Sequence, residues 1–449
     1  MAVALSDWQE AVSAAQEGVI PLPAAHCPLS DSAGLTVGED VRALVSVPRE
    51  ARSAVDGWAV NGSGPWVICD PGIRLSAHQA SRIGKGRPLP AGAKAVLVIE
   101  DSQIVLDAEG LAVVQSSGGA RPGAPRNGEH VVLPGTECLA GDVLLEKGLV
   151  LTPARIALLA AAGLETVPVY PRPAIQVVQS GRVKSSAAPD GTDERDALAA
   201  MLPGTLKAMG ADAVRSLRIG GSADDWLRAL TEEDDGAGAP CDVVLTLGGT
   251  GAGEADHLRE ALSRLGVRYL VEGLLGSPAR TALLGELPDG RYVLGLPGLP
   301  AEALTALSLL GGPLIGALAH RSPVKAKAVP CGVSRDAQQR PTSLVPGRSV
   351  FGMVSPCGEE GRLSAWGEAT LLLAMPPHGV TMGEEILALD LPWTKAERRG
   401  EGVTRPSERP ARGGSAGRDA RTGRTRTRSE PVDWAAQDWD SLRAPGKNP

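Results

Sequence analysis

The sequence predicts a multidomain α/β plus β protein with a β-rich N-terminal region, a central three-layer α/β/α domain and a small C-terminal β domain. Three observations support this prediction. The chain has 449 residues, more than one hydrophobic core usually serves. Strand and helix patterns alternate from residue 174 to residue 319, which favours a mostly parallel sheet. Short apolar runs separated by Gly, Pro and Asp occupy residues 60–150 and 325–393.

Residues 1–170 are predicted to form the N-terminal region. It begins with an amphipathic helix at 5–18, in which Asp7 and Glu10 have the spacing of a capping box. The apolar runs between residues 60 and 150 have the length of strands and not of helices. The region is therefore expected to be rich in β-structure after its helical start.

Residues 171–322 are predicted to form the central domain. Alternating strands and helices place helices on both faces of the sheet. A helix at 300–319 contains Gly-Gly-Pro, which predicts a break or kink. The strands are expected at 174–181, 213–220, 241–249, 268–274, 281–287 and 292–298, and the other helices at 193–209, 222–233 and 254–265. A further helix expected at 152–163 belongs to the N-terminal region.

Residues 323–393 are predicted to be a C-terminal β domain, and residues 394–449 a disordered basic tail. From residue 395 the chain has thirteen Lys/Arg against eight Asp/Glu and few apolar residues. Such a segment buries too little apolar surface to offset its conformational entropy. It is either a solvated tail or an arm that docks weakly on an anionic partner or on a protein.

The composition argues against several classes of protein. A net charge of −7 gives no sign of a nucleic-acid-binding body. The six cysteines are scattered singly, as expected for reduced thiols in the cytoplasm. The N-terminus has no signal-peptide pattern. We expect no apolar run of 18 residues and therefore no membrane segment, since the longest candidate, 156–169, is interrupted by Gly163, Glu165 and Pro168.

The strongest local motif is a glycine-rich loop between an apolar strand and a helix. Its glycines let the backbone approach a ligand and turn its N–H groups inward, and a helix N-terminus favours an anion. No Lys-Ser/Thr follows, so the loop is not a Walker loop. The loop predicts a phosphate site, with a packing turn as the alternative. Its members are Gly248, Gly249, Thr250, Gly251 and Gly253, with Thr250 as a possible hydroxyl donor.

Asp256 follows this loop directly. A carboxylate beside a phosphate repels it unless a cation bridges the two, so Asp256 suggests Mg²⁺. The alternative is that Asp256 only complements the helix dipole.

Two further turns carry polar or tightly turning residues. One, Gly295–Pro300, lies between a strand and a helix, at the sheet edge where open α/β folds bind ligands. The other, Ser53–Val60, contains Ser53 and Asp56 before a strand, and alone is typical of an Asx turn.

Together these motifs resemble the molybdopterin molybdenumtransferase family, over about residues 5–393. SAVDGWA at 53–59 looks like the family's Ser-Ala-Met-Asp-Gly-Tyr-Ala, and KGRPLP at 85–90 like its Thr-Gly-x-Pro-Leu-Pro. GGTGAGEAD at 248–256 resembles Gly-Gly-x-Ser-x-Gly-x-x-Asp, and LPGLP at 296–300 resembles Leu-Pro-Gly-Asn-Pro.

The resemblance implies an enzyme of molybdenum cofactor biosynthesis. Members of the family insert molybdate into adenylylated molybdopterin with release of AMP, in a step that depends on a metal such as Mg²⁺. They work as homodimers in which the central, molybdopterin-binding domain of one subunit meets the partner's N-terminal region. The resemblance implies catalytic roles for Asp56, Asp256 and Glu137, metal binding by Asp56 and Asp256, and substrate binding by Ser53, Gly248, Gly249, Thr250, Gly251, Gly253, Arg280, Pro297, Gly298 and Pro300.

The sequence departs from the family pattern at several polar positions. Lys85 replaces Thr, and Glu137 replaces Asp with a side chain one methylene longer. Of two lysines in the family's Lys-Pro-Gly-Lys-Pro, one survives as Arg280, and Leu299 replaces Asn. The strand end at 179–183 has lost two acids.

These departures leave three hypotheses. The first is an active molybdenumtransferase. The second is a catalytically weakened paralogue that binds molybdopterin, or another molybdenum cofactor enzyme, as a carrier or scaffold. The third is an anion-binding α/β protein for another nucleotide-like metabolite, since the loop also resembles that of molybdopterin adenylyltransferases.

Overall fold

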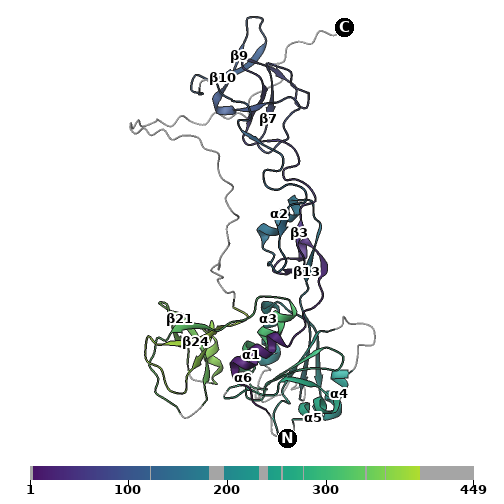
Figure 1. Ribbon diagram of the computed structural model, residues 1–449, viewed down its shortest axis with the longest axis vertical. Helices are drawn as coiled ribbons and strands as arrows, with labels where there is room; N and C mark the ends of the chain where they lie inside the picture. The colour runs from purple at the N-terminus through teal and green to yellow at the C-terminus, as the bar shows by residue number, and fades with distance from the viewer. Residues whose placement is uncertain are drawn as a thin grey trace, which may run out of the picture. The chain divides into compact units, whose positions relative to one another are not determined.

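The structure, a computed structural model, divides the chain into two compact units (Figure 1). The first unit contains the residues up to Val41, Leu145–Ala160 and the described residues from Leu164 onward. The second contains Arg42–Leu144 and Ala161–Gly163. The predicted basic tail lies outside the described residues, except for Thr394. The structure describes residues 4–121, 123–181, 197–231, 241–253, 256–276, 278–338, 341–358 and 361–394.

The N-terminal helix α1 (Trp8–Glu17) belongs to the first unit and has the predicted capping box. Asp7 Oδ1 accepts the Gln9 N–H at 2.9 Å, and Glu10 Oε2 accepts the Asp7 N–H at 3.2 Å. These bonds satisfy backbone donors that a helix start leaves free. The apolar face of α1, with Trp8 and Val12, joins the large core of this unit.

A small antiparallel sheet of the first unit has the order β1-β13-β2. The predicted helix at 152–163 is present as α2 (Pro153–Ala161), and Thr152 Oγ1 accepts the Arg155 N–H at 3.4 Å as an N-cap. The strands are β1 (Ala25–Pro28), β2 (Thr36–Val37) and β13 (Thr166–Tyr170), with a 3₁₀ turn at Leu29–Asp31 and a two-stranded pair of β3 (Val41–Arg42) and β12 (Val143–Leu145).

The central sheet has the strand order β15-β14-β16-β19-β18-β17. The first four strands are parallel, and β18 and β17 run antiparallel at one edge. The mostly parallel sheet of the prediction is therefore confirmed. Its strands are β14 (Ala174–Ser180), β15 (Asp212–Ile219), β16 (Val243–Leu247), β17 (Arg268–Val271), β18 (Leu283–Glu286) and β19 (Tyr292–Leu296).

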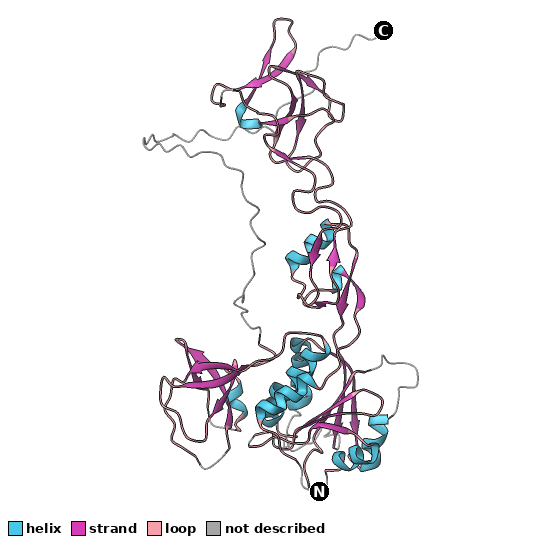
Figure 2. Ribbon diagram, viewed as in Figure 1, coloured by secondary structure: helices cyan, strands magenta, loops and turns pink. Residues whose placement is uncertain are grey.

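Helices cover both faces of this sheet, as Figure 2 shows. One face packs with α1, α3 and the long helix after β19, around Val177 and Leu245. The other face packs with α4 and α5, around Val178 and Val244. Alternate residues of a strand point to opposite faces, which explains this division. The helices are α3 (Ala197–Met209), α4 (Ala223–Thr231), α5 (Leu258–Leu265), α6 (Pro300–Ala306) and α7 (Gly312–Leu318).

The predicted break in the last helix is a π-helical turn at Leu307–Gly311, between α6 and α7. It lies where Gly-Gly-Pro interrupts the helix, and the Gly312 N–H bonds to Leu307 O, five residues back. The expectation that the chain has no apolar run of 18 residues is wrong at this helix. Pro300–Leu318 is long and apolar enough to cross a membrane by length and composition alone, and 78% of it is buried inside the structure.

The C-terminal sheet has the order β20-β24-β23-β21-β22 and is antiparallel throughout. One face, with Leu372 and Leu389, joins the core of the first unit, and the other, with Leu373 and Val345, forms a separate core. The strands are β20 (Lys327–Pro330), β21 (Ser343–Val350), β22 (Met353–Pro356), β23 (Leu371–Met375) and β24 (Glu385–Asp390), with a 3₁₀ turn at Leu363–Trp366.

The second unit is built on a six-stranded sheet of order β8-β5-β7-β6-β10-β9. Trp58 and Trp66 are the large side chains of its core. The predicted fold class, multidomain α/β plus β, is thus confirmed. The strands are β4 (Arg52–Ser53), β5 (Gly57–Asn61), β6 (Trp66–Cys69), β7 (Gln79–Ile83), β8 (Ala95–Val98), β9 (Ser102–Leu106), β10 (Ala112–Ser116) and β11 (Val131–Val132), with a 3₁₀ turn at Ile99–Asp101.

Candidate functional site

The candidate site lies at the carboxyl edge of the central sheet. The strand order reverses at β14, which has β15 on one side and β16 on the other. Open α/β sheets bind ligands outside the carboxyl ends of the strands at such a reversal. Ser180 at the end of β14 donates its hydroxyl to Leu247 O at 3.3 Å, and so links the ends of β14 and β16.

The glycine loop leaves the sheet through two residues in the left-handed region. Gly248 has φ +76° and Gly249 has φ +69°, conformations that favour glycine. Gly248 N–H donates to Leu296 O at 3.0 Å, which joins the loop to the end of β19. A Cβ on Gly249 would lie 3.0 Å from the buried indole ring of Trp226, so the loop packs directly on α4.

The helix after the loop starts later than predicted. The sequence pattern placed its start at residue 254, whereas α5 begins at Leu258 with His257 as its N-cap residue. Residues 254 and 255 lie outside the described part of the chain. Asp256 therefore precedes the helix and does not lie in its first turn.

Asp256 folds its side chain back over the loop. Its Oδ2 atom accepts the Gly253 N–H at 3.0 Å, and its own N–H donates to Gly253 O at 3.0 Å. A Cβ on Gly251 would lie only 2.5 Å from the same carboxylate oxygen. The absence of a Cβ at Gly251 and Gly253 thus allows the Asp256 carboxylate to approach the loop closely.

Thr250 points into the protein and is 2% exposed. Its hydroxyl bonds to the Thr281 hydroxyl at 2.9 Å, and its carbonyl accepts the Arg259 Nε–H at 2.9 Å. Thr281 follows Arg280, whose side chain is exposed. The segment that carries Arg280 is therefore attached directly to the glycine loop.

The second predicted turn, after β19, adjoins the same edge. The atom closest to a Cβ on Gly298 would be Gly248 Cα at 4.0 Å, so the two turns lie within van der Waals distance of each other. Pro297 precedes Gly298 in this turn, and Pro300 begins α6, with Leu299 63% exposed between them.

Glu302 lies in the first turn of α6. Burial raises the pKa of its carboxyl group above the ordinary range. It is the acidic side chain closest in sequence to the Pro297–Pro300 turn.

Ser53 and Asp56 lie together in the second unit. Asp56 is exposed, and its Oδ1 atom accepts the Lys85 N–H at 2.9 Å. Ser53 is 2% exposed and donates its hydroxyl to Val55 O at 2.6 Å. Glu137 is in the same unit, in the turn after Gly135, and its N–H donates to Val47 O at 2.9 Å.

The structure thus brings one group of predicted residues together and leaves the other in a separate unit. The glycine loop, Asp256, the Arg280 segment and the Pro297–Pro300 turn meet at one sheet edge. Ser53, Asp56 and Glu137 belong to the second unit. Within the described residues, no three His, Cys, Asp or Glu side chains gather as a metal-binding group.

Sequence reasoning missed Arg259, which holds the loop from beneath. Its guanidinium donates to the carbonyls of Thr250, Glu272 and Thr281. The available signal was its place in an amphipathic helix, directly beside the buried Leu258. That signal shows that the side chain starts at the edge of the core, but not which carbonyls it reaches.

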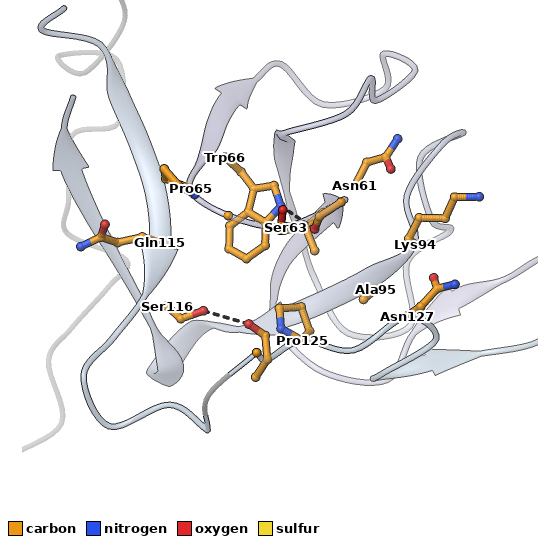
Figure 3. Close-up of a pocket in the computed structure, with 15 residues that line it drawn as sticks. Asn61, Ser63, Pro65, Trp66, Lys94, Ala95, Gln115, Ser116, Pro125 and Asn127 are labelled. Carbon is orange, nitrogen blue, oxygen red and sulfur yellow. Dashed lines mark hydrogen bonds between the residues drawn. The ribbon is translucent and has the colours of Figure 1, made fainter. Parts of the chain in front are cut away.

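A cavity of about 700 Å³ lies in the second unit. Figure 3 shows Asn61, Lys94 and Asn127 at one side of it and Gln115 at the other. Trp66 and Pro65 supply apolar surface between them. None of the predicted site residues, all of which are described, lines this cavity.

Known proteins match this chain over both units. Residues 6–163 match the family described as MoeA N-terminal region (domain I and II), and residues 182–317 match the probable molybdopterin binding domain. Molybdopterin molybdenumtransferase 2 of Mycobacterium tuberculosis is 28% identical over 63% of this chain and 72% of its own length. Molybdopterin molybdenumtransferase of Staphylococcus epidermidis is 26% identical over 65% of this chain and 70% of its own.

Solved structures show the same fold. Two structures of the molybdopterin biosynthesis MoeA protein from Pyrococcus horikoshii have TM-scores of 0.64 and 0.60. They are 22% and 17% identical to this chain, cover 86% of it, and are themselves covered over 99% and 100% of their length. The two family models match in chain order, the relatives are named molybdopterin molybdenumtransferase, and the solved MoeA structures have the same fold. The chain therefore belongs to the MoeA family.

Proposed function

We propose that the chain acts in molybdenum cofactor biosynthesis and inserts molybdate into adenylylated molybdopterin with release of AMP. One observation supports this most directly: the glycine loop, Asp256 and the Arg280 segment meet at the sheet edge where this fold class binds ligands. The relatives named molybdopterin molybdenumtransferase support the same assignment. We place the reaction in the cytoplasm.

The residues at this edge suit a ligand with a phosphoanhydride. Hydrolysis of that bond consumes one water, releases AMP and leaves the pterin phosphate behind. Backbone N–H groups of the loop between Gly248 and Gly253, together with the exposed Arg280 guanidinium, would hold the charged phosphate oxygens. Pro297, Gly298 and Pro300 would shape the opposite wall.

The donor set fits Mg²⁺. Magnesium is usually held by one or two carboxylates together with substrate phosphates and water, so a cluster of three protein ligands is not required. Asp256 offers one carboxylate at the loop, and Asp56 offers an exposed one in the second unit. A bound Mg²⁺ would neutralise phosphate and molybdate charge, while these two carboxylates would orient it.

We further propose that a homodimer completes the site. Ser53, Asp56 and Glu137 of one copy would join the sheet edge of the other, as the family resemblance implies. Mixing inactive Asp56→Asn and Asp256→Asn chains tests this, because a mixed dimer has one intact site. With random pairing we expect about a quarter of wild-type AMP release. No recovery on mixing would mean that both carboxylates serve the same copy, or that they do not share a site.

The central experiment measures AMP release by purified protein with adenylylated molybdopterin, molybdate and Mg²⁺. Release well above the blank, reduced at least 100-fold in Asp256→Asn, would support the proposal; such a loss equals about 2.7 kcal/mol of transition-state stabilisation. Release no faster than the blank, with molybdopterin still bound, would instead support a carrier or scaffold. A chain that bound neither ligand would favour another nucleotide-like metabolite.

A further inference from the structure

Arg259 joins three separate backbone segments at the candidate site. Its Nε–H donates to Thr250 O at 2.9 Å, in the glycine loop. Its Nη2 group donates to Glu272 O at 2.8 Å and to Thr281 O at 3.0 Å. The side chain is partly buried, and no carboxylate of the described residues forms an ion pair with it. Its charge is therefore used to hold backbone carbonyls.

The two threonines on either side of this guanidinium also bond to each other. Thr250 Oγ1 and Thr281 Oγ1 are 2.9 Å apart, and Thr250 is buried. The glycine loop and the segment before β18 are thus linked twice, through one side-chain pair and through Arg259. We call Arg259 and the Thr250–Thr281 pair the clasp.

The segment that the clasp holds is strained. Ala279 is fully buried and has φ +74°, in the left-handed region that a Cβ disfavours. Arg280 O accepts the Leu274 N–H at 3.1 Å, which fixes the next peptide. Such strain persists only where surrounding contacts determine the backbone, and it concentrates at functional sites.

Arg280 emerges from this held segment with an exposed side chain, and it forms no ion pair with any described residue. Three neighbours fix its backbone position: Thr281 in the clasp, Ala279 in its strained turn and Leu274, whose N–H donates to Arg280 O. A cation held in this way beside a glycine loop is suited to reach an anion that the loop binds.

We propose that Arg259 is a positioning residue, which acts through Arg280 by holding it at a fixed place relative to the glycine loop. This inference rests on the proposed function. Arginine suits the role because its planar fork donates in several fixed directions, and a lysine ammonium has no such fork. The clasp therefore needs arginine specifically, and not only a positive charge.

The test is steady-state AMP release by Arg259→Lys, which keeps the charge and loses the fork. We expect KM for adenylylated molybdopterin to rise about tenfold, which corresponds to ~1.4 kcal/mol. Arg264→Lys is the matched control, because Arg264 lies on the same helix and, among the described residues, forms ion pairs with Glu260 and Asp224. Its KM should stay within about twofold of wild type.

A double variant separates positioning from general support of the fold. If Arg259 acts through Arg280, Arg259→Lys adds little to the loss already caused by Arg280→Ala. The inference would be overturned if the fold losses of Arg259→Lys and Arg280→Ala multiplied in the double variant. It would also be overturned if the KM of Arg259→Lys equalled that of wild type. Should Arg259→Lys not fold, Thr281→Val opens the other half of the clasp and is judged by the same two criteria.

AMP release by the wild-type chain shows whether a negative result counts against the positioning role of Arg259 or against the proposed function. An active wild type with an unaffected Arg259→Lys removes the positioning role and leaves the proposed function intact. A wild type without AMP release removes the proposed function and the positioning role with it.

Discussion

The left-handed backbone of Ala279 is the sharpest conflict between residue type and conformation in the loop before β18. The Lys-Pro-Gly-Lys-Pro motif that residues 277–281 resemble has Gly where this chain has Ala279, and a φ of +74° suits glycine. The left-handed region costs an L-residue with a Cβ roughly 1–2 kcal/mol of conformational free energy, whereas glycine adopts it without this cost.

Ala279→Gly should therefore stabilise the protein. We expect the free energy of unfolding to rise by about 0.5–1 kcal/mol, after allowing for the greater entropy of glycine in the unfolded chain. Urea unfolding measures this. Ala282→Gly is the control, since Ala282 is also buried but has no positive φ, and it should lower stability by about 0.5–1 kcal/mol. A loss in both variants would show that Ala279 is not strained.

The buried carboxyl group of Glu302 predicts that stability depends on pH. Burial raises the pKa of its carboxyl above the ordinary 4.5, so folding favours the protonated form. This group therefore contributes most to stability below pH 4.5, and the contribution is lost as pH rises through the folded pKa. Glu302→Gln should gain stability relative to wild type between pH 4.5 and pH 7.5. Thermal unfolding at both pH values tests this, and an identical difference at the two would contradict it.

For single residues, the sequence predicted positions that a local motif marks. It did not predict residues whose partners lie far away in the chain. Glycine content and spacing were enough to place the loop at 248–253. The clasp could not be predicted, because Arg259 and Thr281 are 22 residues apart and meet only through the folded sheet. The same reason hides Trp226, which fills the space under Gly249 from a different helix.

Among the elements, α1 shows how a local signal becomes part of the core. Its capping box fixes where the helix begins, and this sets which side chains face inward. Trp8, Ala11 and Ala15 are all nearly unexposed.

Asp7→Ala should lower the free energy of unfolding by about 1 kcal/mol, because it leaves the first-turn N–H groups without their acceptor. Chemical denaturation of the two proteins measures the difference. Ser13→Ala is the control: among the described residues its hydroxyl donates to the exposed Glu17, so its effect should stay below about 0.5 kcal/mol. Equal effects of the two substitutions would mean that the cap does not stabilise α1.

Element type was predicted better than element boundaries. Strand and helix patterns gave the correct order through the central domain, because its elements alternate and each has a strong period. The start of α5 was placed four residues early, at 254, because the glycine loop was read as leading directly into the helix. The Asp256 side chain accepts the Gly253 N–H, and this contact delays the start of the helix. The periodicity of apolar residues in the helix carries no information about it.

At the scale of the whole molecule, the described core ends at Trp393. Its ring lies 6.0 Å from that of Trp366, at the edge of the main core. Thr394 closes the segment, with its N–H and hydroxyl both donated to Leu391 O.

A chain ending at Thr394 should therefore keep its stability within about 0.5 kcal/mol of the full chain. A chain ending at Pro392 lacks Trp393 and should lose about 1–3 kcal/mol. Differential scanning calorimetry of the three chains makes the comparison. If removal of 395–449 alone lowered stability by more than 1 kcal/mol, the tail would have a role in the fold.

In the first unit, the N-terminal helix packs against segments that are made much later in the chain. α1 packs on α7, and Gln16 bonds to Val324, 308 residues later. A ribosome adds roughly 5–20 residues per second, so α1 leaves the exit tunnel about 15–60 s before its partner is made. The second unit, which is encoded in between, can fold during that interval, while α1 keeps its apolar face uncovered. Newly made chains should therefore depend on chaperones at their N-terminus for longer than their size alone would suggest.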